Sequence, residues 1–193
     1  MKASTALLPF TLLGAALGVD MAKYQPGTGV EAAFKPFLES LYAYAEDYKA
    51  TDTFTDFFVP DTGRLVVLEN QAQGPAAIVK LKQALLPTTG EKHWNHLPNA
   101  TTVYSETAGQ KVYNVYGVIQ TRFDGGNCSI AYYSSRFTVL KDGKGAVRNT
   151  PHSGSLVLYD DYVGWKCCKT RFQPCGQISE KNYLERHRRG KRL

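Results

Sequence analysis

The feature that most constrains the fold of this chain is a change in hydrophobic period near residue 100. Before that point, apolar side chains recur at three- and four-residue intervals, which is the spacing of one helix face. After it, β-branched and aromatic residues alternate with polar ones, which is the spacing of strands with one buried face. The chain is therefore predicted to fold as helices followed by a sheet, an α+β arrangement.

The helical half contains two apolar patterns that differ in length. Proline favours the first turn of a helix, so the regular part of the first helix is expected to begin at Pro36. A short apolar segment follows at residues 54–58, a strand is predicted at residues 64–69, and a last helix at residues 75–86. The stripe of the first helix consists of Phe34, Leu38, Leu41, Ala45 and Tyr48.

Four strands are predicted in the second half, at residues 101–107, 111–123, 128–140 and 155–165. Turns rich in glycine, asparagine and aspartate separate them. Strands joined by short turns pair as antiparallel neighbours, so these four form a meander. Two or three helices would close one face of a curved sheet and leave a conical pocket, which is a common place for a ligand.

The amino terminus predicts secretion. Residues 1–18 combine a positive start with an apolar run, and small residues stand at Ala16 and Gly18, where a signal peptidase cleaves. The run is too short to span a membrane. We therefore expect a signal peptide over residues 1–18 and a single extracellular domain over residues 19–176.

The cysteines and glycosylation sequons are consistent with that compartment. An even number of cysteines in an oxidising environment favours disulfides, and their spacing does not match a zinc site. We expect Cys128 to pair with Cys167 or Cys168, and Cys175 to pair with the other. Sequons at Asn99 and Asn127 predict N-linked glycans.

The net charge of +6 arises largely from the last residues of the chain. From residue 180 onward six basic side chains stand against two acidic ones, so the folded body is close to neutral. Residues 177–193 are predicted to be a disordered or trimmed tail, because Arg188-Arg189 and Lys191-Arg192 have the form of dibasic processing sites. Neither nucleic acid nor a membrane is an expected partner.

Two segments of the chain resemble a known superfamily. Residues 54–85 (FTDFFVPDTGRLVVLENQAQGPAAIVKLKQAL) and 155–165 (SLVLYDDYVGW) are similar to segments of the cone-shaped nuclear transport factor 2-like superfamily, and most of all to its secreted fungal SnoaL-like proteins of unassigned role. The resemblance implies a cone of curved sheet closed by helices, a small hydrophobic molecule as partner, and a homodimer formed through the outer sheet face. It implies no cofactor.

The candidate chemistry centres on the segment Lys92-His93-Trp94-Asn95-His96, predicted to precede the second strand. Histidine is suited to proton transfer near neutral pH. If the segment is a turn or 3₁₀ helix, His93 and His96 face one side, and Trp94 lies beside them. The spacing also suits a metal, but no third ligand is evident, so no metal site is predicted.

Acidic and aromatic residues complete the candidate set. Asp56 is the single acid of its apolar segment and a candidate base, while Tyr48, Tyr116 and Tyr133 are candidate ligand contacts. Scytalone dehydratase, a member of the superfamily, has a similar tyrosine and histidine, but its aspartate after the helix tyrosine is Lys49 here. One of Asp160 and Asp161 must point toward the helix-covered face, since side chains alternate along a strand.

Two functions remain open at this stage. The first is a secreted protein that binds a small hydrophobic ligand in its cone without a catalytic set. The alternative is a cofactor-independent lyase, isomerase or cyclase that acts on a polyketide-like molecule, with His93 or His96 as acid and base. The lining of the pocket discriminates between them: histidine, acid and tyrosine converging on an open cavity favour catalysis.

Overall fold

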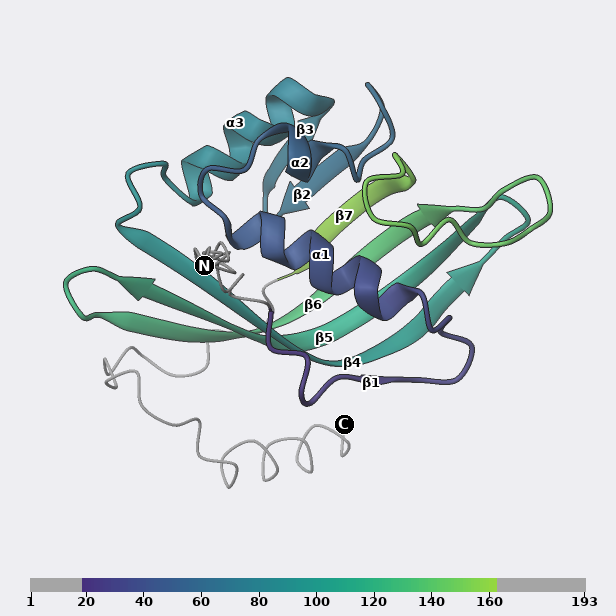
Figure 1. Ribbon diagram of the computed structural model, residues 1–193, viewed down its shortest axis with the longest axis horizontal. Coiled ribbons are helices and arrows are strands. Elements are labelled where there is room, and N and C mark those ends of the chain that lie inside the picture. The colour runs from purple at the N-terminus through teal and green to yellow at the C-terminus, as the bar shows by residue number, and fades with distance from the viewer. Residues whose placement is uncertain (1–18, 163–193) are drawn as a thin grey trace, which may run out of the picture.

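The computed structural model describes residues 19–162, which form one curved sheet with three helices against one of its faces (Figure 1). The sequence prediction of an α+β fold with a helix-covered, curved sheet is confirmed. Within the described residues, no helix is long and apolar enough to cross a membrane. The helices are α1 (Phe34–Glu46), α2 (Asp52–Thr55) and α3 (Pro75–Leu85).

The sheet has seven strands in the order β1-β4-β5-β6-β7-β2-β3. The predicted meander is its centre, since β4 to β7 pair antiparallel in sequence order. β2 then pairs parallel with β7, and the short β3 completes that edge. The strands are β1 (Gln25–Pro26), β2 (Arg64–Val67), β3 (Asn70–Gln73), β4 (Lys92–Glu106), β5 (Gln110–Phe123), β6 (Cys128–Leu140) and β7 (Leu156–Tyr162).

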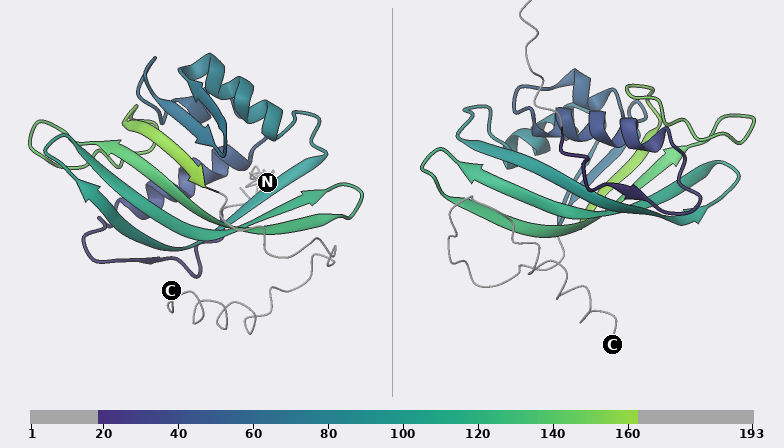
Figure 2. Two further views of the ribbon diagram at one scale, coloured as in Figure 1. Left: turned by 180° about the vertical axis from the view of Figure 1, so that it is seen from behind. Right: turned by 60° about the horizontal axis from the view of Figure 1, so that its bottom comes forward.

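The core lies between α1 and the concave face of the sheet (Figure 2). Phe34 of α1 stacks on Tyr113 of β5, with ring centroids 3.9 Å apart, and Phe37 packs edge-on against Phe57 beyond α2. Strong strand curvature lets strands that are not neighbours face each other across this concave side. The opposite, convex face is not covered by any helix of the described residues.

Two predicted boundaries were wrong. α1 begins at Phe34 rather than Pro36 and ends at Glu46, so Tyr48 lies beyond the helix. β4 begins at Lys92 rather than at residue 101. A register shift between Pro98 and Ala100 leaves Asn99 as an extra residue in the strand, and such a bulge accommodates a proline that cannot donate to the ladder.

Candidate functional site

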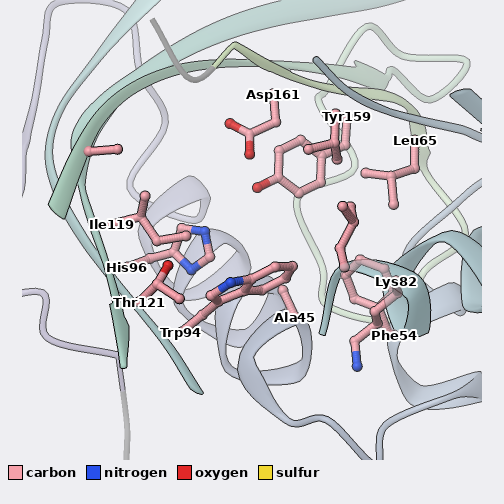
Figure 3. A pocket seen from close by; sticks show the side chains of 13 residues that line it. Ala45, Phe54, Leu65, Lys82, Trp94, His96, Ile119, Thr121, Tyr159 and Asp161 are labelled. Atoms are coloured by element: carbon pink, nitrogen blue, oxygen red, sulfur yellow. The ribbon is translucent and has the colours of Figure 1, made fainter. Parts of the chain in front are cut away.

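A cavity of about 180 Å³ lies between the helices and the concave face of the sheet (Figure 3). Its wall is mainly apolar, and it draws side chains from all three helices and from five strands. Two polar groups that carry acid–base chemistry, His96 and Asp161, are part of this wall. The lining residues are Ala45, Phe54, Leu65, Val67, Lys82, Leu85, Trp94, His96, Ile119, Thr121, Ala131, Tyr159 and Asp161.

His96 is held in the cavity wall by Glu46, the last residue of α1. One carboxylate oxygen, Glu46 Oε1, accepts a hydrogen bond from the backbone N–H of His96 at 2.5 Å and lies 3.0 Å from its ring Nδ1. Because a carboxylate only accepts, Nδ1 carries the hydrogen, and Nε2 is the nitrogen left to act on a ligand. The His96 side chain is 4% exposed and that of Glu46 15%, so the pair is shielded from water.

Aromatic rings fix the plane of the His96 imidazole. Tyr42 of α1 stacks on it in parallel, with ring centroids 4.3 Å apart and planes 7° from parallel. Tyr133 of β6 meets it edge-on at 5.6 Å, and Trp94 does so at 6.4 Å. Burial raises the pKa of the Tyr42 and Tyr133 hydroxyls, so both rings remain uncharged.

Asp161 is the second buried polar group of the cavity. It lies on β7, and Ser135 of β6 donates a hydrogen bond from Oγ to its Oδ1 at 2.5 Å. Burial is the largest cause and raises the pKa of the Asp161 carboxyl, and the hydrogen bond from Ser135 opposes that rise only in part. The carboxyl group therefore holds its proton more tightly than an exposed aspartate does.

Lys82 lines the cavity with its stem and directs its charge elsewhere. Its Nζ donates to the backbone oxygens of Asp47 at 2.5 Å and of Ala50 at 3.2 Å, in the turn after α1. Burial lowers the pKa of this amine. Lysines on an amphipathic helix usually face solvent, so no pattern in the sequence indicated that Lys82 lines the cavity.

The arrangement of elements is shared with several solved structures. A protein from Novosphingobium aromaticivorans described as a scytalone dehydratase superposes with a TM-score of 0.53 at 11% identity, over 76% of this chain and 93% of its own. A hexachlorocyclohexane dehydrochlorinase gives 0.51 at 10% identity, over 75% and 96%. ActVI-ORFA from Streptomyces coelicolor gives 0.50 at 12% identity, over 67% and 96%.

The chain shares the fold of these three proteins, and this is the cone fold that the resemblance to the nuclear transport factor 2-like superfamily implied. At these identities the likeness shows the fold alone. No family model matches the sequence, and no curated protein matches it. The narrower resemblance to secreted fungal proteins therefore stays a prediction.

The expectation that both histidines face one side of the cone was wrong. They lie on a strand, where residues three apart point to opposite faces. His96 stands opposite Ile119 of β5 and points into the cone, whereas His93 stands opposite Arg122. His93 is half exposed, and its Nε2 lies 3.2 Å from a carboxylate oxygen of Asp124.

Some of the other predicted site residues lie at the cavity, and the rest do not. Trp94 lines the cavity, and Tyr133 packs behind His96. Asp56, the candidate base, is exposed at the end of α2 and does not line the cavity, because its apolar neighbours turn inward and leave it on the solvent side. Tyr48 lies in the turn after α1, 6.4 Å from the His93 ring, and Tyr116 is 41% exposed; neither lines the cavity.

The cysteines and sequons are only partly within the described residues. Cys128 is buried at the start of β6, while Cys167, Cys168 and Cys175 lie outside the described residues, so the disulfide pairing stays a prediction. Asn127 is exposed in the turn between β5 and β6. Asn99 is half-buried at the β4 bulge.

The predicted signal peptide and basic tail also lie outside the described residues. Within residues 19–162, no group of three or more histidine, cysteine or acidic side chains is arranged to hold a metal ion.

Proposed function

We propose that this protein binds a small, largely apolar molecule in its cone and that His96 transfers a proton to or from it. One observation carries the proposal: His96 lines the cavity while its Nδ1 is committed to Glu46. A buried carboxylate that orients an imidazole also stabilises the imidazolium formed when Nε2 accepts a proton. The geometry thus favours the catalytic alternative over a cone without a catalytic set.

The reaction class that suits this site is a cofactor-independent elimination, isomerisation or cyclisation. Each begins when a base removes an acidic proton from a molecule held in a dry pocket. Two proteins with the same fold are named for the loss of water and of hydrogen chloride from their substrates. His96 is placed to act as the base in a step of that kind.

Simple binding is the second candidate, and the apolar lining of the cavity favours it. Ala45, Leu65, Ile119 and Ala131 offer contact area but no chemistry. The two functions differ in what loss of the imidazole does. If the protein only binds a ligand, replacing His96 by a polar residue of similar size leaves the affinity for small molecules nearly unchanged. There is then no reaction rate for the replacement to lower.

The biological setting is also part of the proposal. The amino-terminal sequence supports a secreted protein with a signal peptide over residues 1–18. The cysteines and the two sequons support disulfides and N-linked glycans. Val19, the first residue after the predicted cleavage site, has a buried side chain. Exposed Tyr104, Tyr116 and Ile130 on the sheet support a homodimer formed through its outer face.

The test uses 5-nitrobenzisoxazole, a neutral bicyclic molecule whose ring opens to a coloured phenolate once a base removes one carbon-bound proton. Wild-type protein is expected to accelerate this opening, and His96→Gln to lower the rate about 100-fold, the lower range for general base catalysis. His93→Gln is the matched control, because that histidine lies three residues away on the outer face. Equal rates for wild type and His96→Gln would rule out His96 as the base.

A further inference from the structure

The cavity has a second polar side, and that side defines the kind of molecule it accepts. We propose that Asp161 is a neutral carboxyl group that donates a hydrogen bond to an oxygen of the ligand, so the cone selects compact, uncharged molecules with an oxygen acceptor. This inference rests on the proposed function, because it concerns the ligand of the same cavity.

Asp161 and His96 belong to strands that are not neighbours. His96 is on β4 and Asp161 on β7, with β5 and β6 between them in the sheet. The curvature of the sheet brings both side chains into the wall of one cavity, where Figure 3 shows them with Tyr159 and Trp94 around the same space. A ligand in this cavity therefore has the Glu46-bound imidazole and the Asp161 carboxyl as its two polar neighbours.

The surroundings of Asp161 do not support a charged carboxylate. Its side chain has one hydrogen bond within the described residues, from the neutral Ser135 hydroxyl. The positive charge of Lys82 is used by the backbone oxygens of Asp47 and Ala50, and His96 is paired with Glu46. An unpaired charge is strongly disfavoured in such a site, so the group keeps its proton instead.

A neutral carboxyl group in this position is a donor that lacks an acceptor. It carries one O–H, and its Oδ1 already accepts the hydrogen bond from Ser135. No other side-chain hydrogen bond of Asp161 is present among residues 19–162. Buried donors are normally satisfied, and the open volume beside this one belongs to the cavity, so an oxygen of the ligand is the acceptor that fits.

Size and charge narrow the ligand further. An apolar cavity of about 150 Å³ binds benzene, so this cavity of about 180 Å³ suits a compact aromatic molecule. An anion would meet Asp161, and the charge of Lys82 is already bound by the backbone oxygens of Asp47 and Ala50. A cation would require the carboxyl to lose its proton. The ligand must therefore be small enough for the cavity, uncharged, and able to accept a hydrogen bond through an oxygen. An aryl or cyclic ketone, aldehyde or alcohol meets these three conditions.

Four probes with nine heavy atoms each test this selectivity. Acetophenone is neutral and offers a carbonyl oxygen, α-methylstyrene replaces that oxygen by carbon, benzoate is an anion and benzamidine a cation. Dissociation constants are measured by ligand-observed NMR on the mature protein. We expect wild type to bind acetophenone about tenfold more tightly than benzoate or benzamidine.

Three variants locate the cause of that preference. Asp161→Leu, which has no donor, is expected to weaken acetophenone about five- to tenfold, the size of one hydrogen bond, and to leave α-methylstyrene unchanged. Asp161→Asn keeps a donor and is expected to keep acetophenone binding. Asp160→Asn is the matched control, since Asp160 is the next residue, lies opposite Arg136 and does not line the cavity. Thermal melting confirms that each variant is folded.

The outcomes separate this inference from the proposed function. The inference is overturned if benzamidine is the tightest ligand of the wild type and loses that affinity in Asp161→Asn, because this result would show that the Asp161 carboxylate is charged. Acetophenone binding that is unchanged in Asp161→Leu would also overturn it, and both results leave a ligand site in the cone. Failure of all four probes to bind would overturn the ligand site itself.

Discussion

One carboxylate oxygen of Glu46 binds His96 twice, through the backbone N–H at 2.5 Å and through ring Nδ1 at 3.0 Å. The two residues are 50 positions apart, at the end of α1 and within β4. The contact therefore ties the helix layer to the sheet and at the same time orients the imidazole. The same two hydrogen bonds therefore stabilise the packing of α1 on the sheet and orient His96 for proton transfer.

Glu46→Ala is expected to destabilise the protein by about 2–4 kcal/mol, because it leaves two buried donors without an acceptor. Glu46→Gln keeps an amide oxygen and is expected to cost less than half as much. The free energy of unfolding in urea measures both. Equal costs for the two variants would mean that the hydrogen bonds contribute little and that only packing is lost.

The same pair predicts the tautomer of His96. With Nδ1–H donated to Glu46, the neutral imidazole has its lone pair on Nε2, and long-range ¹H–¹⁵N correlation spectra distinguish the two nitrogens. We expect the Nδ1–H form in wild type and in Glu46→Gln, and a mixture in Glu46→Ala. An Nε2–H form in wild type would contradict the role given to His96.

Asp161→Asn is expected to stabilise the protein, and to do so more strongly as the pH rises. The pKa of Asp161 is raised above its ordinary value of 3.8, mainly by burial, so the folded protein binds this proton more tightly than the unfolded chain. Stability is therefore full below 3.8 and is lost as the pH rises through the raised value. Asparagine carries no such penalty and still accepts from Ser135.

Urea unfolding at several pH values between about 4 and 8 measures this difference. The gap between Asp161→Asn and wild type should widen with pH. Asp56→Asn, at an exposed aspartate, is the control and should follow wild type. A gap that stays constant over this range would mean that the Asp161 proton is held equally in the folded and unfolded states.

The sequence predicted the element order of the cone because periodicity records which face of each element is buried. The long strands and α1 all bury one face, so their apolar spacing survives in the sequence. The side chain directions of His93 and His96 were not predictable in this way. They depend on whether residues 92–96 form a turn or a strand, and Pro98 favours the turn unless a bulge is assumed.

The chemistry of the site was harder to predict for a different reason. Glu46 and His96 contact each other through the packing of α1 on the sheet, and no spacing in one sequence encodes such a contact. Lys82 is buried because two backbone oxygens satisfy its amine, which a helical pattern does not record. Asp161 was easier to predict, since strand alternation already required one member of the Asp160-Asp161 pair to point inward.

Peptide mapping of the unreduced protein tests the predicted disulfides. We expect one peptide that joins Cys128 to Cys167 or Cys168, and a second that joins Cys175 to the other of these two. Both should disappear when the protein is reduced before digestion. A Cys128–Cys175 peptide would contradict the prediction.

Gly117 lies against the residue that supports His96. A Cβ at this position of β5 would be 2.5 Å from the Tyr133 hydroxyl and 2.6 Å from the backbone oxygen of Leu97. Gly117→Ala is therefore expected to cost about 1–3 kcal/mol of unfolding free energy, the usual range for overpacking. Gly109→Ala is the matched control, because a Cβ there would meet nothing within 4 Å.

A double-mutant cycle identifies which of the two contacts matters. The added Cβ would also lie 2.6 Å from the ring carbon Cζ of Tyr133, which phenylalanine would keep. Tyr133→Leu removes both the hydroxyl and the ring and leaves the Leu97 oxygen in place, so Gly117→Ala should cost less in a Tyr133→Leu background than alone. Because the Tyr133 ring packs edge-on against His96, the single Gly117→Ala variant should also slow the opening of 5-nitrobenzisoxazole. Additive unfolding costs would mean that the backbone of β4, rather than Tyr133, sets the requirement for glycine.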